Sequence, residues 1–333
     1  MSAPVLRGVA FAVLLFVLVQ LGALALVDTF FEQGYQAVEN PDDPTISVLY
    51  IGAILVATAF MLAAFKYNLD WIVRLVVVGV SGLLAFYVFA AIVPAIVALV
   101  GGVAIAAALL IHPEWYVIDT AGVLMGAGAA GLFGITFGVL PAILLLVVLA
   151  VYDAISVYGT EHMLDLAEGV MDLHIPVVLI VPLSLSYSLL DDDSDEETLG
   201  DDSDEKADGA IADSSASTDS ENDRSEDEDS SLDREAFFIG LGDAVIPAVL
   251  VASAAFFSPA TNYGFAVIEL NTPALFAGLG TIGGLLVLMW MVQKGRAHAG
   301  LPLLNGGAIG GYLLGSIVAG VTLVDAIGLG QFI

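Results

Sequence analysis

The chain contains apolar runs that are too long and too poor in charge for a soluble domain. One of them covers residues 71–111 and includes a single charged side chain, Arg74. At a helical rise of about 1.5 Å per residue, this run is about twice as long as the roughly 30 Å hydrocarbon core of a bilayer. It predicts two membrane-spanning helices with Pro94 near the turn between them. Hydrophobic residues make up 59% of the chain and charged residues 14%, which excludes an ordinary soluble enzyme.

Similar runs along the rest of the chain predict an all-α integral membrane protein with nine transmembrane helices. Residues 117–158 are long enough for two helices, the second opening at Pro141. The first run, 8–27, contains an Ala-Leu-Ala sequence that resembles a signal-peptidase site. Because the run is longer than the usual signal-peptide core of about 7–15 residues, we interpret it as a retained helix. The remaining predicted spans cover residues 46–65, 236–257, 273–292 and 301–321.

The distribution of basic residues predicts the orientation of the chain. Cytoplasmic loops of membrane proteins carry an excess of lysine and arginine. With nine spans and a cytoplasmic N-terminus, every basic residue outside the acidic segment described next falls on the cytoplasmic side, and the C-terminus lies outside. These basic residues are Arg7, Lys66, Arg74, Lys294 and Arg296.

Residues 191–235 form an acidic segment that holds 21 of the 37 acidic residues and 3 of the 8 basic residues. It contains too little apolar surface to offset the entropy of ordering, so we expect a disordered cytoplasmic loop between the sixth and seventh helices. The loop divides the chain into an N-terminal six-helix bundle (1–190) and a C-terminal three-helix part (236–333). In the first part, residues 160–173 have the pattern of an amphipathic interfacial helix, and residues 175–190 are interpreted as interfacial or re-entrant.

The net charge of −29 and the absence of cysteine exclude several kinds of partner and site. An acidic surface with few lysines disfavours nucleic acid and anionic lipid, and it suggests an origin in a very salty cytoplasm. Without cysteine, the chain has no disulfides, thiolate metal sites or cysteine nucleophiles. No His-Glu-x-x-His motif occurs, so we expect neither a zinc site nor any cofactor beyond water.

Two aspartates stand out inside predicted spans, where a charged side chain costs about 2.5–3.5 kcal/mol on insertion scales. Asp153 lies about five residues from the cytoplasmic end of the sixth span, and Asp243 about seven residues from the cytoplasmic start of the seventh. We therefore expect both carboxyls about 8–11 Å below the cytoplasmic edge of their helices. Facing carboxyls share one proton, so one acts as a base toward water while the other protonates a carbonyl.

The residues around these aspartates resemble the signature of presenilins and signal peptide peptidases, the GxGD intramembrane aspartyl proteases. The matching segments are Tyr-Asp at 152–153, Gly-Leu-Gly-Asp at 240–243 and Leu-Pro-Leu at 301–303, and the stretch 152–158 is most similar to archaeal presenilin homologues. The resemblance implies an endopeptidase that cleaves transmembrane helices of membrane proteins or signal peptides within the lipid bilayer. It implies that Asp153 and Asp243 are the catalytic pair. It also implies that the site is shaped by Tyr152, Gly240, Leu241 and Gly242.

The third motif of the family, Pro-Ala-Leu, has its best match at residues 299–302, where this chain reads Ala-Gly-Leu-Pro. Ala299 replaces the proline and Gly300 replaces the alanine, whereas Leu301 and the trailing Pro302 remain. In the family this motif lies beside the aspartates and helps to place the substrate. The resemblance therefore implies that Gly300, Leu301 and Pro302 also shape the active site.

Three other functions fit parts of the sequence. An ion-coupled transporter or channel would use the same two aspartates to bind a proton or cation, although no clear internal repeat relates the two halves. The Gly-Val-Ser-Gly sequence at 79–82 matches the nucleophile motif of rhomboid serine proteases, but the four histidines all lie at span ends or in loops. A scaffold without activity would recruit partners through the acidic segment.

Hydrolysis within a membrane-spanning helix requires local unwinding of the substrate. A helical substrate hides its scissile carbonyls in internal hydrogen bonds, so it must be unwound first. We expect extended residues near 175–185, or those before 236, to pair with the unwound strand.

Overall fold

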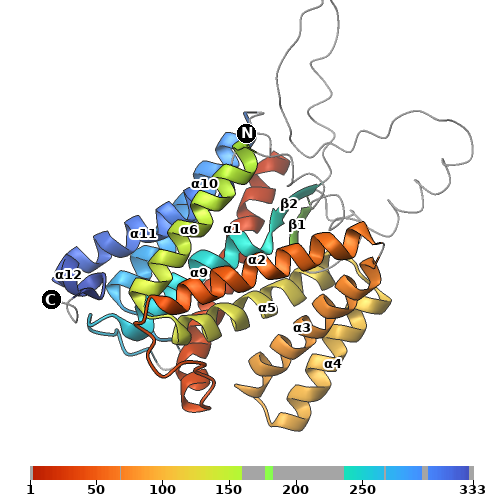
Figure 1. Ribbon diagram of the computed structural model, residues 1–333, viewed down its shortest axis with the longest axis horizontal. Coiled ribbons are helices and arrows are strands. Elements are labelled where there is room, and N and C mark those ends of the chain that lie inside the picture. Colours follow the sequence, from red (N-terminus) through yellow and green to blue (C-terminus); the bar gives the residue numbers. More distant parts are fainter. Residues whose placement is uncertain are drawn as a thin grey trace, which may run out of the picture.

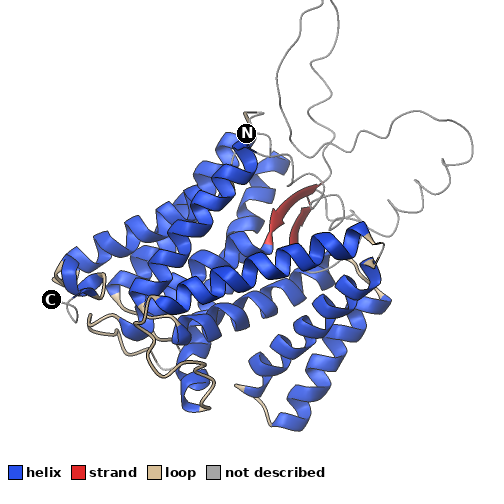
Figure 2. Ribbon diagram, in the orientation of Figure 1, coloured by secondary structure: helices blue, strands red, loops and turns tan. Residues whose placement is uncertain are grey.

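The computed structural model describes residues 3–67, 69–159, 177–182, 236–265, 268–294 and 299–329. These residues form a bundle of helices with one small sheet at one end (Figures 1 and 2). The interfacial helix predicted at 160–173 and the acidic segment at 191–235 lie outside the described residues.

The helices follow the predicted apolar runs closely. In chain order they are α1 (Ala3–Glu32), α2 (Thr45–Lys66), α3 (Asp70–Ala90), α4 (Ala95–Ile111), α5 (Trp115–Thr136), α6 (Val139–Gly159), α9 (Leu241–Phe257), α10 (Thr272–Val292), α11 (Gly300–Val318) and the short α12 (Leu323–Ala326). Within the described ranges, seven of these are long and apolar enough to cross a membrane, and the apolar helices α4 and α9 have 17 residues each. Pro94 directly precedes α4, and Pro141 lies in the first turn of α6, where a missing N–H is tolerated.

A two-stranded antiparallel sheet corrects the prediction of an all-α fold. Strand β1 (Val178–Pro182) pairs with strand β2 (Ala236–Gly240). The predicted seventh span therefore begins as a strand, and its helix starts only at Leu241. The β2 sequence Ala-Phe-Phe-Ile-Gly is rich in aromatic and β-branched residues, which favours a strand once a partner is available. The segment predicted as interfacial or re-entrant at 175–190 supplies that partner.

Glycines allow the helices to approach one another at backbone distance. Helices α10 and α11 run antiparallel, and a Cβ on Gly307 would collide with the carbonyl oxygen of Gly280. A Cβ on Gly311 would likewise collide with the carbonyl oxygen of Phe276. The two helices therefore pack without intervening side chains, as small residues permit in membrane bundles. Helix α2 is different, because most of its residues are exposed, as expected for a helix that faces lipid.

The bundle has two ends that carry different elements (Figure 1). At the sheet end, β2 leads into α9, α6 and α10 finish, and α11 begins. At the opposite loop end, α9 and α11 finish, α6 and α10 begin, and residues 258–271 connect α9 to α10. The last turns of α6 and the first turns of α9 and α11 consequently meet beside the sheet.

Candidate active site

The structure brings Asp153 and Asp243 together at the sheet end. Asp153 lies in the last two turns of α6 and is 8% exposed, whereas Asp243 lies in the first turn of α9 and is partly buried. The two carboxyls are close enough for the charge of Asp153 to act on Asp243. The predicted pairing of the two aspartates across neighbouring helices is thus present in the fold.

The position of Asp243 along its helix differs from the prediction. It is the third residue of α9 and not a residue two turns inside a span, because the five residues before α9 form strand β2. The ladder extends one residue beyond the strand, since the N–H of Leu241 donates to the carbonyl of Val177 at 2.7 Å. The depth estimate from helical rise therefore does not apply to Asp243. Its carboxyl instead lies at a helix N-terminus, where the helix dipole favours negative charge.

Pro247 modifies the same turn of α9. It lies inside the helix, one turn after Asp243. Proline has no N–H, so the carbonyl of Asp243 lacks its usual partner four residues later in the helix. The turn that carries the carboxyl is therefore held by fewer main-chain hydrogen bonds than the rest of α9.

The third predicted motif reaches both aspartates. The N–H of Leu301, in the first turn of α11, donates to Oδ2 of Asp153 at 3.0 Å. A Cβ on Gly300 would lie 3.1 Å from Oδ2 of Asp243 and 3.4 Å from Cδ2 of Leu288. Gly300 therefore leaves little free space beside Asp243. Pro302 follows in the first helical turn, where its ring is tolerated.

The remaining predicted site residues have different surroundings. A Cβ on Gly240 would lie 3.7 Å from Oδ2 of Asp243, which is ordinary contact, so close packing does not require glycine there. A Cβ on Gly242 would also meet only ordinary contact, and this residue is exposed. Leu241 is 5% exposed and packs into the core, whereas Tyr152 is 43% exposed. Close packing thus requires glycine at neither position, and Leu241 anchors the start of α9.

Two polar residues near these elements were not predicted from the sequence. Asp119 in α5 is 4% exposed, and its Oδ1 accepts a 2.8 Å hydrogen bond from the N–H of Ile180 in β1. Asn305 is fully buried in α11, and its Nδ2 donates to the carbonyl of Leu146 in α6 at 2.9 Å. The rule that acids within spans are functional candidates also applies to Asp119, but this residue lies at the very start of its apolar run.

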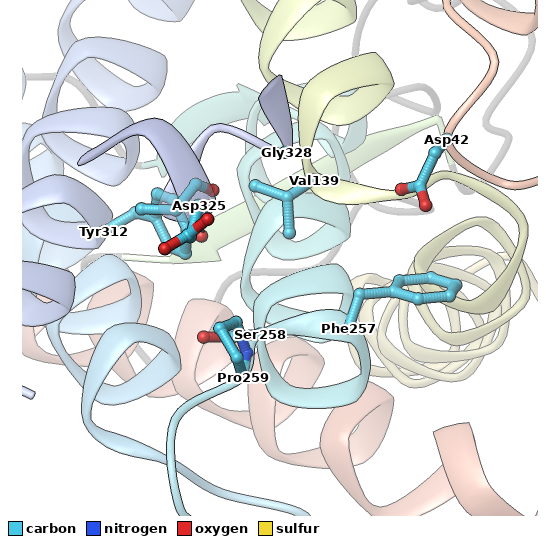
Figure 3. Close-up of a pocket in the computed structure, with 9 residues that line it drawn as sticks. Asp42, Val139, Phe257, Ser258, Pro259, Tyr312, Asp325 and Gly328 are labelled. Atoms are coloured by element: carbon cyan, nitrogen blue, oxygen red, sulfur yellow. Dashed lines mark hydrogen bonds between the residues drawn. The ribbon is translucent and has the colours of Figure 1, made fainter. Parts of the chain in front are cut away.

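A separate cavity of about 350 Å³ lies at the loop end (Figure 3). Its lining includes Asp42, Ser258, Tyr312 and Asp325. Since Val139 at the start of α6 and Phe257 at the end of α9 also line it, the cavity lies at the opposite end of these helices from the two aspartates.

Metal-dependent and serine-protease chemistry find little support in the described residues. In that part of the chain, no group of three or more histidine, cysteine, aspartate or glutamate side chains is placed to hold a metal ion. The hydroxyl of Ser81, the serine of the rhomboid-like motif, donates to the carbonyl of Val77 at 2.7 Å and lies 3.3 Å from Sδ of Met125. These contacts are those of a helix-packing serine.

Comparisons with known proteins agree with this geometry. A family model described as signal-peptide peptidase, presenilin aspartyl protease matches residues 13–321. A solved structure of a presenilin family intramembrane aspartate protease in space group C222 is 30% identical, with a TM-score of 0.61, and the match covers 93% of this chain and 99% of that one. A second, in space group P2, is 29% identical with a TM-score of 0.55, covering 92% and 96%. No curated protein matches the chain significantly.

Proposed function

Because the chain belongs to the signal-peptide peptidase and presenilin family of aspartyl proteases, we propose that Asp153 and Asp243 are its catalytic carboxyls. The protein is a multi-pass membrane protein and an intramembrane aspartic endopeptidase. The observation that carries the assignment of the pair is the convergence of three segments: the end of α6, the start of α9 and the start of α11. The ion-coupled alternative is not favoured by these relatives.

The two carboxyls divide the work of hydrolysis. Two neighbouring carboxyls hold one proton between them, so one removes a proton from water while the other protonates the scissile carbonyl. The hydrogen bond from Leu301 orients the carboxyl of Asp153, and the N-terminus of α9 stabilises charge on Asp243. The close approach of Gly300 to Asp243 fixes one wall of the site. Tyr152, Gly240, Gly242 and Pro302 line its approaches in this proposal.

The substrate is a transmembrane helix of a membrane protein or a signal peptide, locally unwound at the scissile bond. The two segments expected to pair with that strand, near 175–185 and before 236, pair with each other as β1 and β2. The substrate strand therefore joins the outer edge of β2, on the side away from β1. Strand β2 leads directly into the turn of α9 that carries Asp243. The partly exposed Phe238 lies in this strand.

Nine helices cross the membrane in this proposal, with the sheet end facing the cytoplasm and the C-terminus outside. Arg7, Arg74 and Lys294 lie at the start of α1, the start of α3 and just after α10, and Lys66 ends α2. Helices α1, α3 and α5 run parallel, because residues later in one helix contact residues later in the next. The starts of these helices therefore lie at the same end of the bundle, and the basic residues gather at the sheet end. The parts 1–190, 191–235 and 236–333 are then the helix bundle, the cytoplasmic loop and the C-terminal three helices.

We further propose an archaeal, salt-adapted origin, since the chain carries 37 acidic and only 8 basic residues. Acidic chains repel themselves at low ionic strength, and high salt screens that repulsion. Proteolysis by the purified protein should therefore require a high concentration of KCl.

The decisive experiment measures cleavage of a tagged single-span protein by the purified protease in phospholipid vesicles at high KCl. Asp153→Asn and Asp243→Asn should each reduce the rate by about a thousandfold or more, because each removes one acid–base group. Asp325→Asn, in the cavity at the loop end, is the matched control and should cleave at the wild-type rate. A chelator should have no effect. Full activity in either Asp153→Asn or Asp243→Asn would refute the assigned pair.

A further inference from the structure

Asp119 is a buried acid that the proposed chemistry does not use. It lies in the second turn of α5 and is 4% exposed. One oxygen accepts the N–H of Ile180, and the other, Oδ2, has no hydrogen-bond partner among the described residues. Burying a carboxyl with a single donor is costly, so a feature of this kind requires an explanation.

The geometry of the sheet shows which edge Asp119 occupies. In an antiparallel ladder, pairs that exchange hydrogen bonds alternate with pairs that do not. The hydrogen bond from Leu241 to the carbonyl of Val177 marks a bonded pair, so Leu179 and Ile239 form the next one. Ile180 and Phe238 then form a non-bonded pair, and the N–H of Ile180 points away from β2. Asp119 therefore binds the outer edge of β1.

Apolar side chains also hold β1 against α5. Ile180 is 4% exposed and lies in one buried cluster with Ile118 and Ala121 of α5. On the other strand Phe238, which pairs with Ile180, is 45% exposed. One edge of the sheet is thus covered by α5 and fixed to it by a side-chain acceptor, whereas the other edge belongs to the strand that continues into Asp243.

We infer that Asp119 is a positioning residue: by accepting the N–H of Ile180 it fixes β1 against α5 and thereby holds β2 in one place for a substrate strand. This inference rests on the proposed function, because it assumes that substrate pairs with β2 and is cut at Asp153 and Asp243. When the anchor is lost, β1 and β2 move together relative to Asp153 and the start of α11. The substrate strand is then presented in more than one register. A slip of two residues keeps every side chain on its original face, so such slips are the expected ones.

The test compares Asp119→Leu with Asp119→Asn and reads both rates and product masses on a tagged single-span protein in phosphatidylcholine–phosphatidylglycerol vesicles at high KCl. Asp119→Leu should lower kcat by about tenfold. It should also add products whose ends are displaced by two residues from the wild-type cut. Asp119→Asn keeps an acceptor oxygen for Ile180, so its product masses should match the wild type and its rate should remain within about twofold.

Two further variants provide a packing control and a second way to remove the hydrogen bond to Asp119. Thr136→Val removes a buried hydroxyl at the other end of α5, where it donates to the carbonyl of Leu132, and should leave rate and product masses unchanged. Ile180→Pro removes the donor, together with the apolar contacts of Ile180, and leaves Asp119 in place. It disrupts no β1–β2 hydrogen bond, because residue 180 is at a non-bonded position. This variant should give the same displaced products, and it serves as the test if Asp119→Leu does not fold.

The outcomes distinguish this inference from the proposed function. Wild-type product masses and rate in folded Asp119→Leu or Ile180→Pro would overturn the role of Asp119 while Asp153→Asn and Asp243→Asn remain inactive. Unchanged cleavage in Asp153→Asn or Asp243→Asn would instead overturn the proposed function. Displaced products in Asp119→Asn as well would show that the negative charge, and not the hydrogen bond to Ile180, matters, and would also contradict the inference.

Discussion

The two ends of the bundle treat buried polar groups in opposite ways. At the loop end, Nδ2 of Asn271 donates to the carbonyls of Ala254 and Ala255, and its Oδ1 accepts the N–H of Ala274. At the sheet end, Asp153 accepts one hydrogen bond from Leu301, and Asp119 leaves one oxygen without a partner among the described residues. Fully paired groups stabilise a fold, whereas a carboxyl with spare acceptors beside the site, such as that of Asp153, is available to a ligand or to water. The loop end is thus built for stability, whereas the sheet end carries the carboxyls available for chemistry.

The largest effect is expected when the space beside Asp243 at the sheet end is filled. Gly300→Val should lower the cleavage rate by about a hundredfold without a matching loss of stability, because its Cβ and methyl groups displace a carboxyl that lies 3.1 Å from the Cβ position. Initial cleavage rates and thermal midpoints measure the two effects separately. Gly306→Val, on the same helix with no heavy atom within 4 Å of its Cβ position, is the control. Equal rates in the two variants would contradict the prediction.

A second test addresses the pair of helices that joins the two ends. Gly307→Ala should destabilise the protein by about 3 kcal/mol, because its Cβ meets the backbone carbonyl of Gly280 and α10 and α11 must separate. Equilibrium unfolding in detergent micelles measures this loss. Gly306→Ala has open space at its Cβ position and should change stability by less than about 0.5 kcal/mol. If both variants unfold alike, the close packing of the two helices is not a stabilising contact.

A third test perturbs the loop end alone. Asn271→Ala should cost about 2 kcal/mol of stability, since it removes the cap of α10 and leaves two carbonyls without this donor. Each folded molecule should still cleave at the wild-type rate. Asn271→Ser retains a capping oxygen and should lose about half as much. A lower cleavage rate in fully folded Asn271→Ala would show that the two ends are coupled, and would contradict the prediction.

The smallest effect concerns two carboxyls at the loop end. A hydrogen bond with Asp28, followed by burial, raises the pKa of Glu269 above its ordinary value of 4.5. The folded state therefore favours protonated Glu269. Its contribution to stability is complete below about pH 4.5 and disappears as the pH rises through the raised pKa.

Glu269→Gln resembles the protonated side chain and should reduce this loss of stability with rising pH. The difference should be less than about 1 kcal/mol, because the residue is partly solvated. Thermal midpoints from pH 4 upward, in about unit steps, measure it. Glu39→Gln, at an exposed position, should follow the wild-type pH dependence. Parallel curves for wild type and Glu269→Gln would show that Glu269 does not contribute to the pH dependence of stability.

The positions of the long helices could be predicted because length and hydrophobicity alone determine them. The run at 71–111 gives two helices, α3 and α4, separated at Pro94 as expected. The sheet could not be predicted in this way. Short apolar runs such as 178–182 and 236–240 fit a strand or part of a helix equally well, and only their pairing across more than fifty residues of chain decides between them.

The candidate site was predicted in part. The resemblance at 240–243 and 299–302 identified residues that the structure places around the two carboxyls, including the hydrogen bond from Leu301. The predicted depth of Asp243 was wrong, because the prediction assumed a helix over the residues that form β2. Asp119 was not predicted as a site residue, because its partner is a main-chain N–H in β1. The spacing of side chains in the sequence does not reveal such a partner.

The proline in α9 has a mechanical consequence for the residue one turn before it. Since Pro247 provides no N–H, the carbonyl of Asp243 does not form the usual helical hydrogen bond to residue 247. Tilting the first turn of α9 therefore breaks one main-chain hydrogen bond fewer than tilting the start of an uninterrupted helix. The carboxyl is therefore carried by a flexible first turn at the start of an otherwise rigid helix. Small changes in its orientation cost little free energy.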